Sequence, residues 1–167
     1  MKENYKTSNY PGGKLKSETY TEDDTLVTKL YHNSKIRFFK ELTTEKDGIK
    51  EVKHFTLNGV LSKIEYFKGD KREGIETKYL VSKANESIKS TKIYHDGKLH
   101  GECITYNENG EIIKQEGFVL GKVILKYLRE DDNSNEITSI NMIDEESISE
   151  LPEEQQLLIQ DNIAKIK

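Results

Sequence analysis

The sequence has few of the residues that cross-link a chain or interrupt its regular structure: among 167 residues there are one cysteine, two prolines and no tryptophan. Cys103 alone can form neither an internal disulfide nor a multi-cysteine zinc site, which fits a reducing compartment. No apolar run approaches the ~18 residues that a membrane-spanning helix needs. The polar start 1–6 is unlike a secretory signal. We therefore expect a cytoplasmic protein.

The composition allows one modest domain with a thin core. Hydrophobic and charged residues each make up 34% of the chain, and the hydrophobic ones recur along most of its length, which argues against disorder. Residues 130–167 contain 11 acids and 2 lysines, which leaves 24 basic and 19 acidic residues, a net charge of +5, for residues 1–129. An acidic segment of this kind is either a solvated tail or an interaction segment.

Internal repeats organise the chain. The segment 31–36 (Tyr-His-Asn-Ser-Lys-Ile) matches 94–99 (Tyr-His-Asp-Gly-Lys-Leu). A second pattern occurs at 55–61 and again at 106–112: an aromatic residue is followed four positions later by a glycine and six positions later by an aliphatic residue. Most gaps between turn markers span 10–14 residues, the length of one strand and one turn. We expect turns at Gly13, Ser34, Gly48, Gly59, Gly69, Gly97, Gly110 and Gly121.

The segments between these turns are rich in β-branched and aromatic residues that alternate with polar ones, as in 26–31 and 75–81. Asn-Gly and Asp-Gly pairs in the turns are typical of tight β-hairpins. The sequence thus predicts an all-β fold, with about ten short antiparallel strands in an extended hairpin meander. One face of this sheet would be exposed to solvent, and the sheet would be either open and twisted or rolled on itself. A longer loop is expected at 82–87.

The strands are expected to end near residue 129. An acidic linker follows at 130–135, and Pro152, Glu153 and Glu154 suit the first turn of a helix from about 152 to 166. Apolar residues at helical spacing in 158–166 would cover part of the sheet or bind a partner. We therefore assign 1–129 to the β-repeat domain and 130–167 to a linker and a short C-terminal α-helix packed on it.

The segment 94–111, Tyr-His-Asp-Gly-Lys-Leu-His-Gly-Glu-Cys-Ile-Thr-Tyr-Asn-Glu-Asn-Gly-Glu, resembles the bacterial variant of the MORN (membrane occupation and recognition nexus) repeat. Residues 66–74 are similar to a second, degraded copy, and the resemblance covers roughly residues 10–125. Proteins of the YwqK type in this family are described as antitoxins or immunity factors, whereas other MORN proteins are linked to membranes or scaffolding. The resemblance implies hairpins more specifically than it implies a function.

The residue types give little support to catalysis, metal binding or a bound cofactor, and we expect none of the three. His95 and His100 flank a turn and could approach one another, but two imidazoles without a third ligand make a poor zinc site. Cys103 and His100 are three residues apart, so a strand directs them to opposite faces, which opposes a nucleophile–base pair. His32 and His54 are explained as turn and strand residues.

The sequence also argues against nucleic acid and membrane partners. Lysine and glutamate alternate closely in the strand region, which weakens any continuous phosphate track. The predicted helix is acidic at its start, so anionic lipid would repel it. We do not expect nucleic acid, and a membrane partner is disfavoured.

The family resemblance implies a protein-binding module, an antitoxin or immunity protein that occludes a toxin. The acidic segment could complement a basic toxin domain, and the predicted contact residues there are Asp131, Asp132, Asp144, Glu145 and Glu146. The alternative is a structural or scaffolding MORN-type protein, possibly membrane-associated. A monomer would favour the antitoxin, and a concentration-dependent polymer would favour the scaffold.

Overall fold

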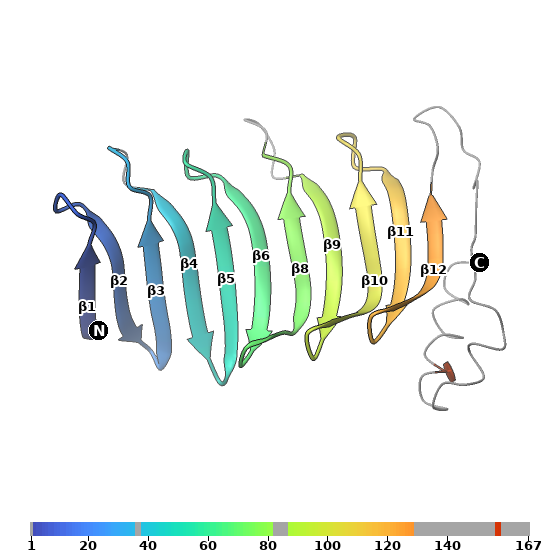
Figure 1. Ribbon diagram of the computed structural model, residues 1–167, viewed down its shortest axis with the longest axis horizontal. Coiled ribbons are helices and arrows are strands. Elements are labelled where there is room, and N and C mark those ends of the chain that lie inside the picture. Colours follow the sequence, from blue (N-terminus) through green and yellow to red (C-terminus); the bar gives the residue numbers. More distant parts are fainter. Residues whose placement is uncertain (1, 36–37, 82–86, 129–155, 158–167) are drawn as a thin grey trace.

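The protein forms a single layer of antiparallel strands (Figure 1). The computed structural model describes residues 2–35, 38–81, 87–128 and 156–157. The strands are β1 (Glu3–Asn9), β2 (Leu15–Glu22), β3 (Thr25–Tyr31), β4 (Phe39–Lys46), β5 (Ile49–Phe55), β6 (Leu61–Lys68), β7 (Lys71–Arg72), β8 (Gly74–Tyr79), β9 (Ile88–His95), β10 (Lys98–Tyr106), β11 (Ile112–Val119) and β12 (Lys122–Leu128).

The sheet is an open meander, in which each long strand pairs with the next one in sequence. Within the described residues β1 and β12 are the two ends of the strand order, and the short β7 pairs only with β6. The predicted all-β hairpin meander is confirmed, and the sheet is open rather than rolled into a barrel. The strand count is twelve rather than about ten, because β1 and the two-residue β7 have no hydrophobic alternation that would reveal them.

Two kinds of turn recur along the chain, and they lie at opposite ends of the sheet. At 10–14, 56–60 and 107–111, the amide of the first residue donates to the carbonyl of the fifth, and the amide of the fourth donates to the carbonyl of the first. These three turns lie at the same end (Figure 1). At the other end are two-residue turns such as Asp47-Gly48 and Asp96-Gly97, where both residues have positive φ. That geometry matches the twist of paired strands and favours Asp, Asn or Gly, although Leu120 adopts it in the turn before β12.

A single layer has no interior between two sheets, so its core consists of side chains covered by their neighbours on adjacent strands. Among the described side chains, the buried apolar residues are Tyr20, Val27, Tyr31, Val52, Cys103, Phe118 and Val119. The described carboxylates of Glu18, Glu65 and Glu76 are buried as deeply as these. The sheet therefore covers charged groups within its own surface, and each such group must be matched by a partner.

The predicted helix over 152–166 and the predicted loop over 82–87 lie almost wholly outside the described residues. Only Gln156 and Leu157 of the helix are described, and both are helical. All described strands fall within residues 1–129. Among the described residues there is no helix long and apolar enough to cross a membrane.

Candidate binding face of the sheet

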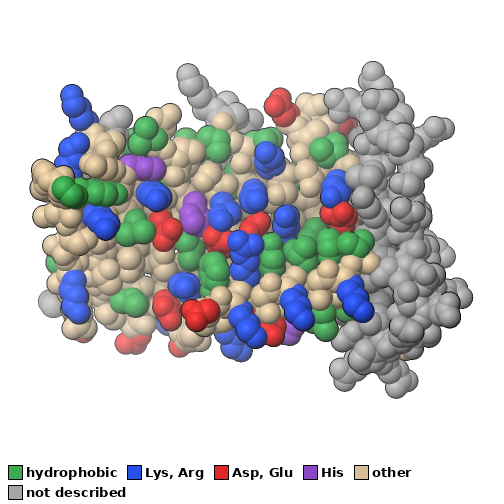
Figure 2. Space-filling view, in the orientation of Figure 1, with side chains coloured by type: hydrophobic (Ala, Val, Ile, Leu, Met, Phe, Trp, Pro, Cys, Tyr) green, Lys and Arg blue, Asp and Glu red, His purple; other side chains and the backbone are tan. Residues whose placement is uncertain are grey.

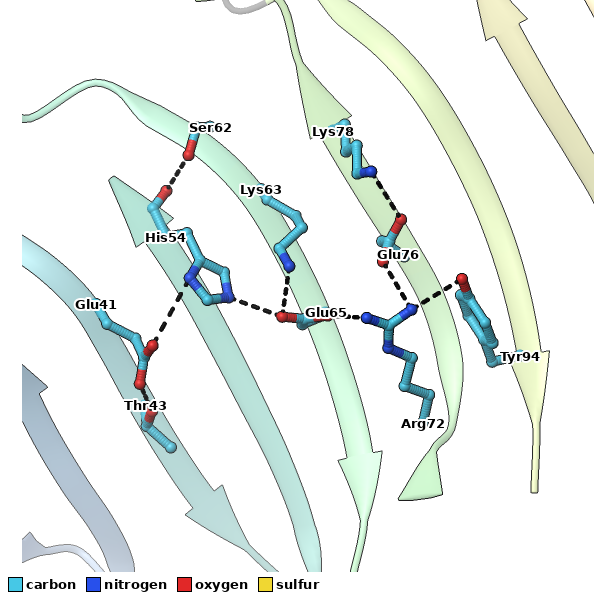
Figure 3. A network of polar contacts seen from close by, with 10 residues as sticks. All are labelled: Glu41, Thr43, His54, Ser62, Lys63, Glu65, Arg72, Glu76, Lys78 and Tyr94. Atoms are coloured by element: carbon cyan, nitrogen blue, oxygen red, sulfur yellow. Dashed lines mark hydrogen bonds and ion pairs between the residues drawn. The ribbon is translucent and has the colours of Figure 1, made fainter. Parts of the chain in front are cut away.

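Charged side chains from five neighbouring strands, β4 to β8, meet on one face of the sheet (Figure 3). Register places Glu41 of β4 opposite His54 of β5, His54 opposite Lys63 of β6, and Lys63 opposite Lys78 of β8. Directly opposed residues in antiparallel strands share a face. We call the seven residues Glu41, His54, Lys63, Glu65, Arg72, Glu76 and Lys78 the charge ladder.

Glu65 lies at the centre of the charge ladder and contacts His54, Lys63 and Arg72. Its Oε1 lies 2.7 Å from Nε2 of His54 and 2.7 Å from Nζ of Lys63. Its Oε2 makes no hydrogen bond to any described residue and lies 3.5 Å from Nη2 of Arg72. Burial acts to raise the pKa of Glu65, but the contacts with Lys63 and His54 outweigh it, so this pKa lies below its ordinary value. Glu65 is therefore a buried, ionised anchor.

Arg72 connects two buried carboxylates. Its guanidinium lies 3.5 Å from Glu65 and 3.4 Å from Oε2 of Glu76, and its Nη1 donates a 3.0 Å hydrogen bond to the hydroxyl of Tyr94. The same guanidinium stacks over the Tyr94 ring at 5.1 Å. Lys78 approaches the other oxygen of Glu76 at 3.7 Å. A planar fork with five donors is suited to this bridging, which a lysine could not reproduce.

The cations of the charge ladder lie above the acids. The side chains of Lys78 and Arg72 are 45% and 40% exposed, whereas those of Glu65 and Glu76 are 7% and 4% exposed. Long basic side chains cover the acids with their stems and keep their charged heads in water. Figure 2 shows Lys and Arg side chains spread over one face of the sheet, with carboxylates and hydrophobic groups between them. A partner that approaches the charge ladder therefore meets positive charge first.

The opposite face holds another buried carboxylate, Glu18 of β2. Thr19 belongs to the cross-strand row that leads to Glu65, so its neighbour Glu18 points to the other side of the sheet. Tyr31 and Tyr5 each donate a 2.7 Å hydrogen bond to the Glu18 carboxylate. Both faces of the sheet thus use buried carboxylates to fix neighbouring strands.

The geometry of these groups suits positioning more than catalysis. Each buried carboxylate already faces a cation or a tyrosine hydroxyl, and burial raises the pKa of the Cys103 thiol, which disfavours the reactive thiolate. His95 and His100 do lie close together, with ring centroids 5.7 Å apart, and Nδ1 of His95 lies 2.9 Å from Oε1 of Glu73. Within the described ranges, no three His, Cys, Asp or Glu side chains are arranged to hold a metal ion.

The residues chosen from the sequence have different outcomes. The five predicted contact acids, Asp131, Asp132, Asp144, Glu145 and Glu146, lie outside the described residues. The seven predicted turn glycines all have positive φ. The sequence reasoning missed Glu41, Glu65, Arg72 and Glu76. Their signal is the strand register: the two-residue turn at Asp47-Gly48, for example, fixes which side chains of β4 and β5 stand opposite one another.

Comparisons with known proteins leave the chain without an assigned family. No protein-family model matches it, and no curated protein matches it. A search of solved structures finds a chain described as "Crystal structure of GtfA/B complex", with 14% identity and a TM-score of 0.24 over 78% of this chain. This chain spans 20% of that one. A similarity this weak carries no argument about fold or function.

Proposed function

We propose that this protein is a non-catalytic protein-binding module, and that it acts as an antitoxin or immunity protein that neutralises a toxin by direct contact. The observation that carries the proposal is the open, single-layer sheet, whose face presents a fixed array of charged heads instead of a catalytic cleft. The MORN-variant resemblance of residues 94–111 supplies the antitoxin role.

The charge ladder favours binding because its side chains are already ordered. Glu65 and Glu76 hold Lys63, Arg72 and Lys78 in place through ion pairs of 2.7–3.7 Å. Side chains ordered before association lose less conformational entropy when a partner binds. A stable interface buries about 800 Å² per partner, and an open sheet of twelve strands provides a continuous surface for one. Occlusion of a toxin's active site is the mechanism that such a surface supports.

The two charged regions would contact a partner in different ways. The outer heads of the charge ladder suit acidic groups near the toxin's active site. The acidic segment 130–167 would steer a toxin whose overall charge is basic. The predicted steering residues remain Asp131, Asp132, Asp144, Glu145 and Glu146.

Co-expression tests the proposed role directly. A toxin gene adjacent to the gene for this protein is expressed with and without it, and we expect cells to survive only when this protein is present. Equal killing in both cases would contradict the antitoxin role.

A charge-reversal variant then tests the face. Lys92 lies on the charge-ladder face opposite Glu76 and forms no ion pair among the described residues, so Lys92→Glu should weaken toxin binding without breaking a structural contact. Lys16→Glu is the matched control, since Lys16 is exposed and lies on the Glu18 face. Equal affinities of the two variants in calorimetry would exclude the charge-ladder face as the interface.

A scaffolding protein is the second candidate, and it is favoured by the edge strand β1. All seven residues of β1 are exposed, and β1 pairs only with β2 among the described strands. An unpaired strand edge is a template for pairing with another chain. Light scattering over a concentration series separates the candidates: growth into a polymer favours the scaffold, and a constant monomer mass favours the antitoxin.

A further inference from the structure

Residues 10–14 after β1 and residues 32–35 after β3 lie at the same end of the sheet (Figure 1). A hollow lies between these two segments. The hollow has a volume of about 350 Å³ and is lined by Tyr5, Lys14, Leu15, Tyr31, His32, Ser34 and Lys35. Volumes from about 300 Å³ upward are typical of sites for small ligands. This hollow lies away from the charge ladder and belongs to the part of the sheet nearest β1.

The lining of the hollow carries positive charge without a matching carboxylate. Lys14 and Lys35 both line it, and no acidic residue among those described does. Neither lysine forms an ion pair with any described residue. The nearby carboxylate of Glu18 is already engaged by Tyr5, Tyr31 and Lys29. The hollow therefore has a net positive field that nothing described on the protein neutralises.

His32 adds a buried nitrogen that has no partner. Its Nε2 is inaccessible to solvent and makes no hydrogen bond to any described residue, although the residue itself lines the hollow. A buried polar atom without a partner is costly to a fold, and it commonly marks a place where a ligand completes the hydrogen bonding. The backbone around His32 is fixed, since its amide donates to Phe38 and the Ser34 amide donates to its carbonyl.

The walls of the hollow are partly apolar. Tyr5, Tyr31 and Leu15 contribute two aromatic rings and an aliphatic chain. Tyr10 donates a 2.9 Å hydrogen bond to the carbonyl of Tyr31 and so ties the turn after β1 to the end of β3. The two turns are thus held together before any ligand arrives.

We propose that this hollow is a binding site for a small organic anion, a phosphate or carboxylate group attached to a small apolar body. Lys14 and Lys35 attract the anionic group, and the tyrosine rings pack against the apolar part. A small rotation of the His32 ring on binding would uncover its Nε2, which then donates a hydrogen bond to the anion. The site does not depend on the proposed antitoxin function, because none of its residues belongs to the charge ladder.

The site is tested by titrating the full chain with phenyl phosphate and, separately, with benzoate. Binding is monitored through the amide chemical shifts in NMR spectra. Benzyl alcohol is the uncharged control. We expect saturable binding of at least one anion, with shifts centred on Leu15 and His32, and no comparable binding of benzyl alcohol. Equal binding of the alcohol, or no saturable binding of either anion, would overturn the proposal.

Variants of the lining identify the groups that bind. Lys14→Met and Lys35→Met should each weaken binding of the anion about tenfold, the value of one charge-assisted contact. Lys16→Met is the matched control, because Lys16 is exposed but does not line the hollow. An equal loss in Lys16→Met would mean that only diffuse charge attracts the anion, and the site would be rejected.

His32→Phe separates a binding role from a structural one. The substitution removes the buried unpartnered nitrogen and keeps a planar ring, so we expect equal or greater resistance to urea together with weaker anion binding. A less stable variant that binds the anion as tightly as the natural protein would show that His32 serves the fold alone.

Discussion

The hydroxyl of Tyr31 donates a 2.7 Å hydrogen bond to Oε1 of Glu18, and both residues are more than nine-tenths buried. Tyr31 lies on β3 and Glu18 on β2, so this contact joins neighbouring strands through their side chains as well as their backbones. A hydrogen bond to a charged group contributes about 1.5–3 kcal/mol. In a sheet without a second layer, such contacts hold neighbouring strands together, a role that a hydrophobic core between two layers would otherwise fill.

Tyr31→Phe should therefore lower the free energy of unfolding by about 1–3 kcal/mol, because it removes the donor and leaves a buried carboxylate oxygen less well satisfied. Urea denaturation measures the change. Tyr106→Phe is the control, since the Tyr106 hydroxyl has no hydrogen-bond partner among the described residues. A loss in Tyr106→Phe as large as that in Tyr31→Phe would contradict the role assigned to the Glu18 contact.

The same carboxylate makes stability depend on pH. Hydrogen bonds from Tyr31 and Tyr5 hold the pKa of Glu18 below its ordinary value, although burial opposes them. A carboxyl whose pKa is lower in the folded state stabilises the fold above its unfolded pKa of about 4.3, and this contribution is lost as the pH falls through the folded pKa. Urea titrations from neutral pH down to about pH 3 should show a shallower acid loss in Glu18→Gln than in the natural protein. An unchanged acid profile would mean that Glu18 does not contribute.

Gly59 and Gly110 occupy equivalent positions in two turns of the same hydrogen-bond pattern, with φ of +79° and +82°. A Cβ at Gly59 would lie 2.7 Å from Cδ1 of Phe38, whereas a Cβ at Gly110 would meet nothing within 4 Å. Both alanine variants suffer from positive φ, at a cost of about 1 kcal/mol. Gly59→Ala should lower the free energy of unfolding by about 1 kcal/mol more than Gly110→Ala does, because the Phe38 ring must move. Thermal or urea unfolding of the pair measures this difference.

A double variant identifies the cause of that difference. In a Phe38→Ala background, Gly59→Ala should cost no more than Gly110→Ala does in the natural protein, since the obstructing ring is gone. A difference that persists in this background would assign the extra cost to the backbone of the turn rather than to Phe38.

Arg72→Met tests the charge ladder, because it removes the cation that faces both Glu65 and Glu76. The carboxylates remain buried, so we expect the free energy of unfolding to fall by about 1–3 kcal/mol. This is less than for a fully buried ion pair, because Arg72 is partly exposed. Lys92→Met, on the same face and without an ion pair among the described residues, should change stability by less than about 0.5 kcal/mol. Equal unfolding midpoints in urea for these two variants would contradict the bridging role of Arg72.

Much of the fold could be predicted from turn chemistry. The pairs Asp47-Gly48 and Asp96-Gly97 are suited to two-residue hairpins, and regular spacing of such turns implies a meander. The strand β1 could not be predicted, because its sequence Glu-Asn-Tyr-Lys-Thr-Ser-Asn has no apolar face. It forms a strand through backbone pairing with β2, whose residues lie 6–18 positions further along the chain and which no apolar pattern in β1 itself reveals.

The candidate sites were less predictable than the fold. Glu65 and Glu76 stand at positions that the sequence presents as ordinary solvated acids. The pairing of β6 with β7 brings Glu65 to Arg72, which lies four residues before Glu76. The hollow near His32 likewise combines two turns that are separated in sequence by the whole of β2 and β3. Both sites depend on register across strands, which composition and local spacing do not contain.

The acidic segment gives the last prediction, which concerns kinetics. If the five predicted contact acids, Asp131, Asp132, Asp144, Glu145 and Glu146, steer a basic toxin, then reversing all five to lysine should lower the association rate constant at least about tenfold at low salt. The dissociation rate should change less, and the association of the variant should depend less on ionic strength. Stopped-flow mixing at several salt concentrations measures these quantities.

The control for this experiment is a second variant that has the same change in net charge, but with its five substitutions in the β-sheet region. It reverses five acids that form no ion pair among the described residues, namely Glu3, Glu22, Glu45, Asp70 and Glu108. If position matters, the tail variant should slow association more than the sheet variant. Equal slowing in the two variants would mean that net charge alone causes the effect. If neither variant associates more slowly, electrostatic steering by the acidic segment is excluded, and contact through the charge-ladder face would have to account for binding.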